Sequence, residues 1–286
     1  MNKSVMNHLK TFWKLILIVG LMILAYFSFM FIGGGFGKKP VNIKAINDGN
    51  SQFLFAHRGL SEYYPENTKE AIEAAKLRGF TGLEIDIRKS SDNEFILFHD
   101  EDCSRLLGIN SKICDLSTSQ IKGRHILFNG IESGSYVLTL KELLNNYKDD
   151  FIIYFDMKLK DIDDIDELVS IIQSYDISGS SIIASTSGFV VFYIEYNYPG
   201  INTALEGFNS GKEWIYCLFP KNFKPDFLSS FAGKVDEKHI SWLRKKDLIS
   251  SRIVYDVDSA NYQQVIKMGL KNLIIDYDST IQIPSF

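Results

Sequence analysis

The chain has 286 residues, of which 45% are apolar and 23% are charged, and its formal net charge is −4. These values are typical of a globular protein with one large domain or two small ones. The negative charge argues against a nucleic-acid partner, since phosphate backbones require a basic protein face.

The first element is an uncharged apolar segment, Leu15 to Ile32. As a helix it would span roughly 27 Å, close to the thickness of a bilayer core. Lysines flank it on both sides: Lys3, Lys10, Lys14, Lys38 and Lys39. We predict a single-pass membrane anchor over residues 1–36, with the N-terminus inside and the following domain extracytoplasmic. A cleaved signal peptide is the alternative, because residues 33–35 are three glycines.

Residues 37–50 are predicted to be a linker, and residues 51–286 to form one barrel domain. Apolar, β-branched runs predict eight strands, at 52–57, 82–88, 151–157, 180–186, 201–207, 227–232, 251–257 and 272–277. Helical patterns lie between most of these runs, which predicts a (β/α)8 TIM barrel. An open, doubly wound sheet is the alternative.

The connection after the second predicted strand is too long for a simple crossover. It holds an extra short strand, EFILFHD, and then a polar insertion over residues 100–137. The connection between the fifth and sixth strands has no clean helical pattern. The basic run Arg244-Lys245-Lys246 is expected to be a solvated helix face.

The three cysteines do not have a metal-binding spacing. Cys103 and Cys114 are close enough in sequence for a disulfide in an oxidising compartment, but two free thiols are the more expected state. Cys217 is expected to be a small core residue rather than a nucleophile.

Polar side chains gather at the ends of the first three predicted barrel strands and of the extra strand. They are His57, Arg58, Glu84, Asp86, His99, Asp156 and Lys158. In a barrel, the carboxyl ends of the strands meet at one rim, so these groups are expected to converge there. A lone histidine at a strand end is usually an ordinary rim residue, but several charged groups in apolar strands are costly unless they are paired or liganded.

Three neighbouring carboxylates repel one another and therefore call for a cation. Because all the donors are oxygens, Ca²⁺ or Mg²⁺ fits Glu84, Asp86 and Asp156 better than Zn²⁺ does. Arg58 has the planar fork that binds phosphate, and Lys158 adds a second cation. Two histidines could move protons. The set predicts cleavage of a phosphodiester.

Three stretches resemble the glycerophosphodiester phosphodiesterase family: HRGLSEYYPENTKEAI, EIDIRKSSDNEFILFHD and GLKNLIIDYD. The resemblance is strongest over residues 55–100 and weaker to about residue 280. It implies a (β/α)8 barrel with an insertion after the second strand. It also implies metal-dependent hydrolysis of glycerophosphodiesters, or of lysophospholipid-type phosphodiesters, to glycerol phosphate and an alcohol.

The resemblance further implies roles for individual residues. His57 and His99 resemble the family's acid/base pair, and Glu84 and Asp86 its metal ligands. Arg58 resembles a phosphate contact, and Glu66 and Asn67 belong to the loop that braces the site. In the family, a neighbouring hydroxyl of the glycerol is thought to attack phosphorus and to give a cyclic phosphate that water opens.

The sequence departs from the family pattern at four places. Leu138-Thr139 replaces a Pro-Thr, and Ile275-Asp276-Tyr277-Asp278 replaces the closing Thr-Asp-x-Pro. The other two departures concern the proposed site directly. Asp156-Met157-Lys158 stands where the family usually has Glu-x-Lys, so the third carboxylate is one methylene shorter. Asp256 replaces the central residue of a Trp-Thr-Val element. It could bind a cationic headgroup, although an exposed rim charge is the more expected role.

Two other classes of protein stay open. A catalytically inactive barrel could bind lipid headgroups or a partner at the membrane. A metal-independent phospholipase could use two histidines on a similar barrel, but it would not need the Glu84/Asp86 pair. The expected partners are a small-molecule or lipid phosphodiester and the membrane, without a nucleic acid.

Overall fold

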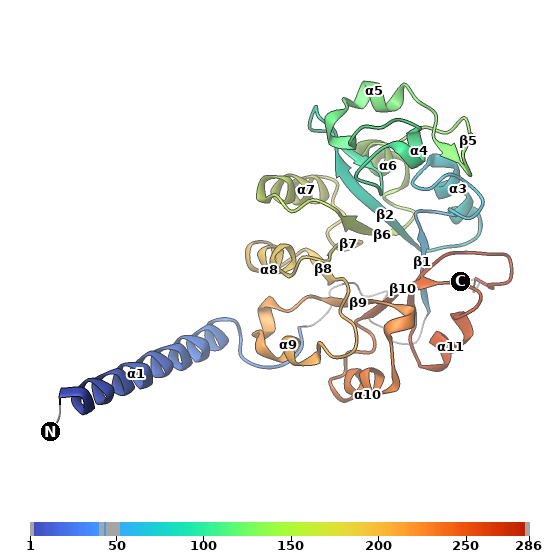
Figure 1. Ribbon diagram of the computed structural model, residues 1–286. Coiled ribbons are helices and arrows are strands. Elements are labelled where there is room, and N and C mark those ends of the chain that lie inside the picture. The colour runs from blue at the N-terminus through green and yellow to red at the C-terminus, as the bar shows by residue number, and fades with distance from the viewer. Residues whose placement is uncertain (1–2, 40–42, 44–51, 284–286) are drawn as a thin grey trace.

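The computed structural model describes residues 3–39, 43 and 52–283. Eight parallel strands form a closed barrel, in which β1 pairs with β11 on one side and with β2 on the other. Figure 1 shows the barrel, with its helices outside it. The predicted (β/α)8 barrel is confirmed, and the open-sheet alternative is wrong.

The barrel strands follow the eight predicted runs closely. They are β1 (Phe53–His57), β2 (Gly82–Lys89), β6 (Ile152–Met157), β7 (Ser181–Ser185), β8 (Asn202–Leu205), β9 (Phe227–Phe231), β10 (Arg252–Val257) and β11 (Asn272–Ile275). Alternate side chains fill the barrel interior, where Phe55, Tyr154 and Phe227 belong to one buried cluster. A larger cluster joins the outer face of the strands to the helices.

Seven helices lie outside the barrel in the described part of the chain, and several of them begin at a residue whose side chain caps them. They are α3 (Lys69–Leu77), α6 (Leu140–Tyr147), α7 (Ile162–Ser174), α8 (Gly188–Asn197), α9 (Glu213–Leu218), α10 (Glu237–Lys245) and α11 (Tyr262–Lys267). Thr68 caps α3, and Thr139 forms a capping box with Glu142 at the start of α6. The weak helical pattern after β8 agrees with the short α9 and the 3-10 turn η2 (Lys221–Phe223).

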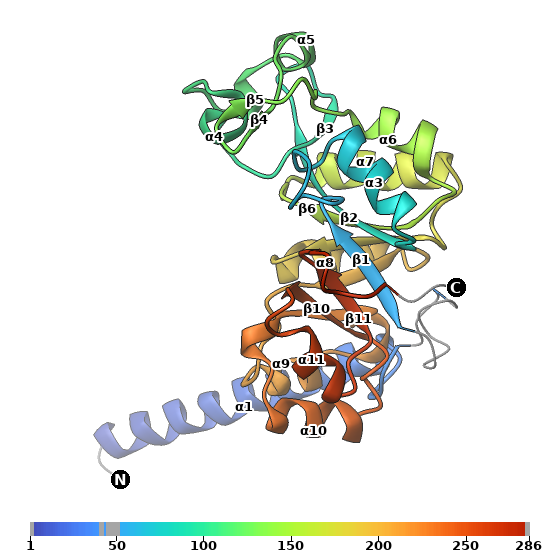
Figure 2. The ribbon, with the colours of Figure 1, turned by 90° about the vertical axis from the view of Figure 1, so that its right-hand side faces the viewer.

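The predicted insertion forms a small lobe beside the barrel mouth (Figure 2). After β3 (Phe95–Leu97), it contains α4 (Ser104–Leu107), η1 (Ile113–Asp115), α5 (Thr118–Lys122), β4 (Leu127–Phe128) and β5 (Ile131–Glu132). Its apolar side chains form their own buried cluster around Phe98, Leu106 and Ile121.

The cysteines are all free, so the disulfide alternative is wrong. Cys103 lies in the buried cluster of the insertion, whereas Cys114 is exposed. Cys217 is exposed on α9, so it is not the core residue that we expected. As expected, Arg244, Lys245 and Lys246 are exposed at the end of α10.

The N-terminal helix α1 (Lys3–Ile32) is long and apolar enough to cross a membrane, and most of its side chains are exposed. It projects away from the barrel (Figures 1 and 2). Of the predicted linker, residues 40–42 and 44–50 lie outside the described residues. Its described members contact the barrel: Lys38 pairs with Asp247, and Ile43 is buried in the barrel cluster.

The register between strands sets the site. His57 lies opposite Glu84, and Asp86 lies opposite Asp156, across neighbouring parallel strands. Since side chains alternate along a strand, residues two apart share a face. Glu84 and Asp86 therefore point to the same side of β2, toward the barrel mouth, together with Asp156 of β6.

Candidate active site

The carboxyl ends of the strands surround a cavity of about 240 Å³. Six of the predicted site residues line it: His57, Arg58, Glu84, His99, Asp156 and Lys158. Asp86 is fully buried next to Glu84 and Asp156. The structure thus brings the predicted catalytic, phosphate-binding and metal-binding side chains together at one end of the barrel.

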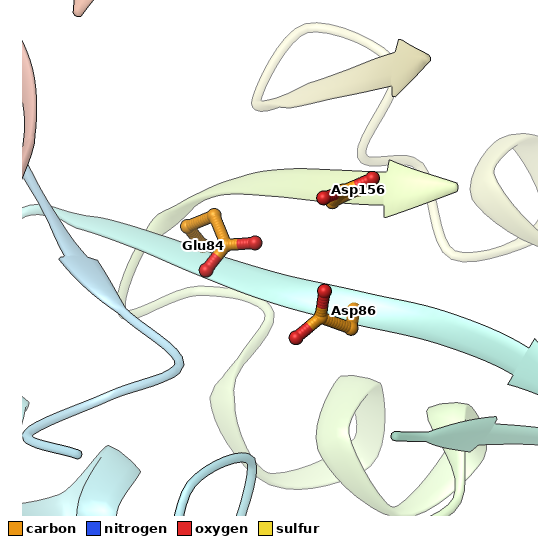
Figure 3. Close-up of side chains that lie close together, drawn as sticks. All are labelled: Glu84, Asp86 and Asp156. Carbon is orange, nitrogen blue, oxygen red and sulfur yellow. The ribbon is translucent and has the colours of Figure 1, made fainter. Parts of the chain in front are cut away.

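Three carboxylates form the centre of this site (Figure 3). One oxygen atom from each of Glu84, Asp86 and Asp156 lies within 4.8 Å of the other two. Burial, and then repulsion from Asp86, raises the pKa of Glu84 to about 8. Burial also raises the pKa of Asp156. A bound cation would remove this repulsion and favour the ionised carboxylates.

Two basic side chains neutralise Asp86. The Nζ atom of Lys158 lies 3.0 Å from Asp86 Oδ1 and 2.5 Å from Asp156 Oδ2. On the other side, Arg58 Nε lies 3.0 Å from Asp86 Oδ2. Burial alone would raise the pKa of Asp86, but attraction to Arg58 and Lys158 outweighs it, and the pKa is lowered. Arg58 and Lys158 thus contact a carboxylate while their side chains also line the cavity.

His57 is the last residue of β1, and each of its two ring nitrogens faces a carboxylate. Its Nδ1 lies 2.5 Å from Asp276 Oδ1, and its Nε2 lies 3.8 Å from Glu84 Oε2. Burial lowers the pKa of His57, but attraction to Glu84 and the hydrogen bond with Asp276 outweigh it and raise the pKa to about 9. Asp276 directly follows β11 and fixes the ring's orientation.

His99 occupies the other side of the mouth, just after β3. Its Nδ1 lies 2.7 Å from Asp100 Oδ1, and Arg105 binds the same carboxylate through two nitrogens. Both site histidines therefore have Nδ1 engaged by a carboxylate, which leaves Nε2 as the nitrogen available for proton transfer.

The loop after β1, which the resemblance implies to brace the site, contacts the site through Asn67 and Glu66. Asn67 adopts a positive φ of 59° and donates from Nδ2 to Asp86 Oδ2 at 3.0 Å. Glu66 joins two guanidinium groups: it accepts from Arg58 at 3.0 Å and from Arg105 at 2.7 and 2.8 Å. This network ties the insertion, which carries Arg105, to the first barrel loop.

Sequence reasoning missed four residues of the site. They are Asp276, Arg105, Glu206 and Tyr154. Glu206 follows β8, lines the cavity and accepts a hydrogen bond from the buried Tyr154 hydroxyl at 2.9 Å. Burial, with repulsion from Asp156, raises the pKa of Glu206 to about 8. A carboxylate at the end of the predicted fifth strand was the signal available for Glu206. Asp256, also lining the cavity, is an exposed rim residue.

The carboxylate cluster fits a divalent metal ion. All three donors are carboxylate oxygens, which suits Ca²⁺ or Mg²⁺. Burial is the main cause of the raised pKa values of Glu84 and Asp156, and repulsion from Asp86 adds to it at both positions. Glu84, Asp86 and Asp156 are therefore the residues that could hold the ion.

Comparison with known proteins identifies relatives of this site. The model of the glycerophosphoryl diester phosphodiesterase family matches residues 57–185. Glycerophosphodiester phosphodiesterase 1 of Mus musculus is 36% identical over 109 residues, which are 36% of this chain but only 33% of that relative.

Two solved structures share the barrel. The phosphodiesterase of Thermotoga maritima has a TM-score of 0.63 and 25% identity, with 79% of this chain and 95% of that chain covered. A phosphodiesterase of Oleispira antarctica, solved with the product sn-glycerol-3-phosphate, has a TM-score of 0.67 and 20% identity, with 80% and 95% covered. Residues 57–185 thus carry the sequence pattern of the glycerophosphoryl diester phosphodiesterase family on this barrel, and the resemblance predicted from the sequence is confirmed.

Proposed function

We propose that this chain hydrolyses glycerophosphodiesters, or lysophospholipid-type phosphodiesters, to glycerol phosphate and an alcohol. The observation that carries the proposal is the meeting of His57, His99 and the three carboxylates around one cavity. The family match over the same residues supports it. So does the bound sn-glycerol-3-phosphate of the Oleispira antarctica relative.

His57 and His99 act as the acid/base pair. One imidazole takes the proton of the substrate's neighbouring hydroxyl while that oxygen forms a bond to phosphorus. The other imidazole gives a proton to the alcohol oxygen as its bond to phosphorus breaks. The cyclic phosphate is then opened by water, with the two proton transfers reversed. Asp276 and Asp100 hold the rings so that each Nε2 can serve in these steps.

The cationic groups hold the phosphate. Arg58 and Lys158 line the cavity and are placed to contact the nonbridging oxygens of a bound phosphodiester. When bound by Glu84, Asp86 and Asp156, a divalent cation would supply further positive charge for these oxygens. Glu66 and Asn67 keep Arg58 and Asp86 in position through the hydrogen bonds described above.

The proposal includes a location and a domain division. Residues 1–36 form a single-pass anchor, residues 37–50 connect it to the barrel, and residues 51–286 form the extracytoplasmic catalytic domain. The length, apolarity and exposure of α1 support an anchor. A signal sequence can be equally long and apolar, so N-terminal sequencing of the mature protein separates an anchor from a cleaved signal.

A direct assay tests the activity. The full chain in detergent should release glycerol phosphate from at least one member of a panel of glycerophosphodiesters in the presence of Ca²⁺ or Mg²⁺. Chelation should abolish the release, and the added ion should restore it. A folded chain that cleaves no member of the panel with either ion would contradict the proposal.

An inactive barrel that binds headgroups is the second candidate. The observation in its favour is that Arg58 and Lys158 already neutralise Asp86, so part of the cluster is satisfied without an ion. In that case, a phosphodiester would bind and stabilise the chain without turning over.

Metal analysis of the purified protein separates the proposed activity from a metal-independent two-histidine phospholipase.

A further inference from the structure

The end of α1 is fixed to one side of the barrel. Met30 is buried, and the ring of Phe29 stacks on Phe223 with 5.5 Å between centroids. Just beyond the helix, Gly33 O accepts from Asn222 N at 2.9 Å, and Gly35 O accepts from Lys221 N at 2.8 Å. These contacts attach the end of α1 directly to η2. They therefore fix the side of the barrel from which α1 leaves the domain.

Exposed apolar side chains lie on the two helices beside this exit point. They are Phe189, Tyr196, Trp214, Leu218 and Phe219 of α8, α9 and the residue after α9, and we call this surface the α8–α9 face. In Figure 1, α8 and α9 lie on the side from which α1 projects. Trp214 is 64% exposed, and Phe189 is 58% exposed. An apolar groove of about 440 Å³ runs between the two helices and reaches Phe29 of α1.

Lysines border the same exit point. Lys38, Lys224, Lys245 and Lys246 line a second cavity of about 230 Å³, beside the exposed Phe36. Lys38 pairs with Asp247. Lys224 is only 3% exposed, yet its Nζ contacts the carbonyl of Gly37 at 2.5 Å and the ring of Tyr216, and no carboxylate pairs with it in the described part of the chain. A buried ammonium without an anion is costly, and an external anion would offset that cost.

We propose that the α8–α9 face and the three accessible lysines that border it, Lys38, Lys245 and Lys246, lie on the surface of an anionic phospholipid bilayer, the bilayer that α1 spans. The inference rests on the proposal that α1 is a retained anchor. Since Phe29 is in the last turn of α1, the groove beside it lies at the boundary between acyl chains and headgroups. Lys38, a few residues further on, then lies at the level of the lipid phosphates. Aromatic side chains and lysines are the residues that favour these two levels.

Tryptophan fluorescence tests this arrangement in the full chain. Replacing Trp13→Phe and Trp242→Phe leaves Trp214 as the single tryptophan, since the chain has three. This variant is placed in nanodiscs of phosphatidylglycerol with brominated acyl chains, which quench tryptophans that contact them. We expect the emission of Trp214 to fall to about half or less of its value in unbrominated nanodiscs, a contact-range effect.

A matched control carries its tryptophan on the opposite side of the domain. Ile131→Trp, in a background without the three natural tryptophans, places an exposed indole on β5 of the insertion, far from α1 in both ribbon views (Figures 1 and 2). Its emission should be unchanged by bromination. Equal quenching at the two positions, or none at Trp214, would overturn the proposal. The proposal would also be overturned if α1 were absent from the mature chain. The same would hold if Trp214 were quenched only in nanodiscs that contain two chains.

Charge reversal tests the part played by the lysines. Lys245→Glu with Lys246→Glu should reduce the quenching of Trp214 at least twofold in phosphatidylglycerol nanodiscs and leave it unchanged in phosphatidylcholine nanodiscs. Lys267→Glu, at an exposed position of α11, is the control and should change neither value. Quenching that does not depend on lipid charge would overturn the assignment of an anionic surface. None of these readouts uses catalysis. A chain that lacks the proposed activity can therefore still show the proposed membrane contact, and the two failures can be told apart.

Discussion

The barrel buries charged side chains at both of its ends, and the two groups differ in what they leave available. The mouth cluster consists of Glu84, Asp86, Asp156, Arg58 and Lys158, as described above. The base cluster consists of Lys39, Glu195 and Asp226. It lies at the amino ends of the strands, because Asp226 directly precedes β9. Both contain more carboxylates than basic groups.

The base cluster is closed by bonds within the chain. Lys39 Nζ hydrogen-bonds Glu195 and lies 3.1 Å from Asp226 Oδ1. Thr203 donates from its hydroxyl to Glu195 at 2.6 Å and from its backbone N–H to Asp226 at 3.0 Å. The side chains of Glu195 and Asp226 are 0% exposed. The mouth cluster instead lines a cavity, so a buried charge group indicates function only where its atoms can still reach a ligand.

The largest expected effect concerns the mouth. His57→Ala and His99→Ala should each lower kcat by about 10²- to 10⁴-fold, because each removes a group that transfers a proton. Glycerol phosphate release by the full chain measures the effect. His125→Ala, in the insertion and packed at a tilt against the ring of Tyr136, should retain activity. Near-normal turnover by either site variant, with folding verified, would remove the histidines from the mechanism.

The base cluster should respond in stability rather than in rate. Lys39→Met leaves Glu195 and Asp226 buried without their cation, and we expect a loss of about 3–5 kcal/mol in the free energy of unfolding. The neighbouring variant Lys38→Met breaks an exposed pair and should cost less than about 1 kcal/mol. Urea unfolding of both variants in detergent measures the difference. Equal losses would show that the base cluster stabilises the fold no more than the exposed Lys38–Asp247 pair does.

A positioning residue should give a smaller change in rate. Asp276→Asn keeps the size of the side chain but weakens the hold on His57 Nδ1, and we expect kcat to fall by roughly 10- to 100-fold. Because Asp276 does not touch substrate in the proposed mechanism, KM should change little. A rise in KM at constant kcat would instead assign Asp276 to substrate binding.

The pH dependence of stability gives the smallest expected effect. Burial, and then repulsion from Asp226, raises the pKa of Glu195 from 4.5 to about 8. Its contribution to stability is therefore fully present below pH 4.5 and is lost as the pH rises through 8. Glu195→Gln mimics the protonated acid, so its stability should fall less than that of the wild type between pH 5 and 8, by about 1 kcal/mol or more. Parallel curves for the two proteins would contradict a raised pKa for Glu195.

The same comparison explains what could be predicted from sequence. The mouth residues His57, Glu84 and Asp86 lie on strands whose apolar pattern is clear, so both the fold and the core of the site follow from local signals. Asp276 contacts His57 across 219 positions of sequence, and only barrel closure brings the two together. Lys39 was assigned to a linker because the partners that bind it, Glu195 and Asp226, lie 156 and 187 positions away in the sequence.

The pairing of β2 with β6 has a consequence for how this protein can change. Asp86 faces Asp156 at the same level of two adjacent parallel strands, and each strand alternates between the mouth and the helix layer. Inserting or deleting one residue at the start of either strand would turn its acidic groups into the apolar layer and bring apolar groups to the cavity. Length variation among descendants of this chain should therefore be confined to the connections, while these two strands keep their spacing even where most of their residues are replaced.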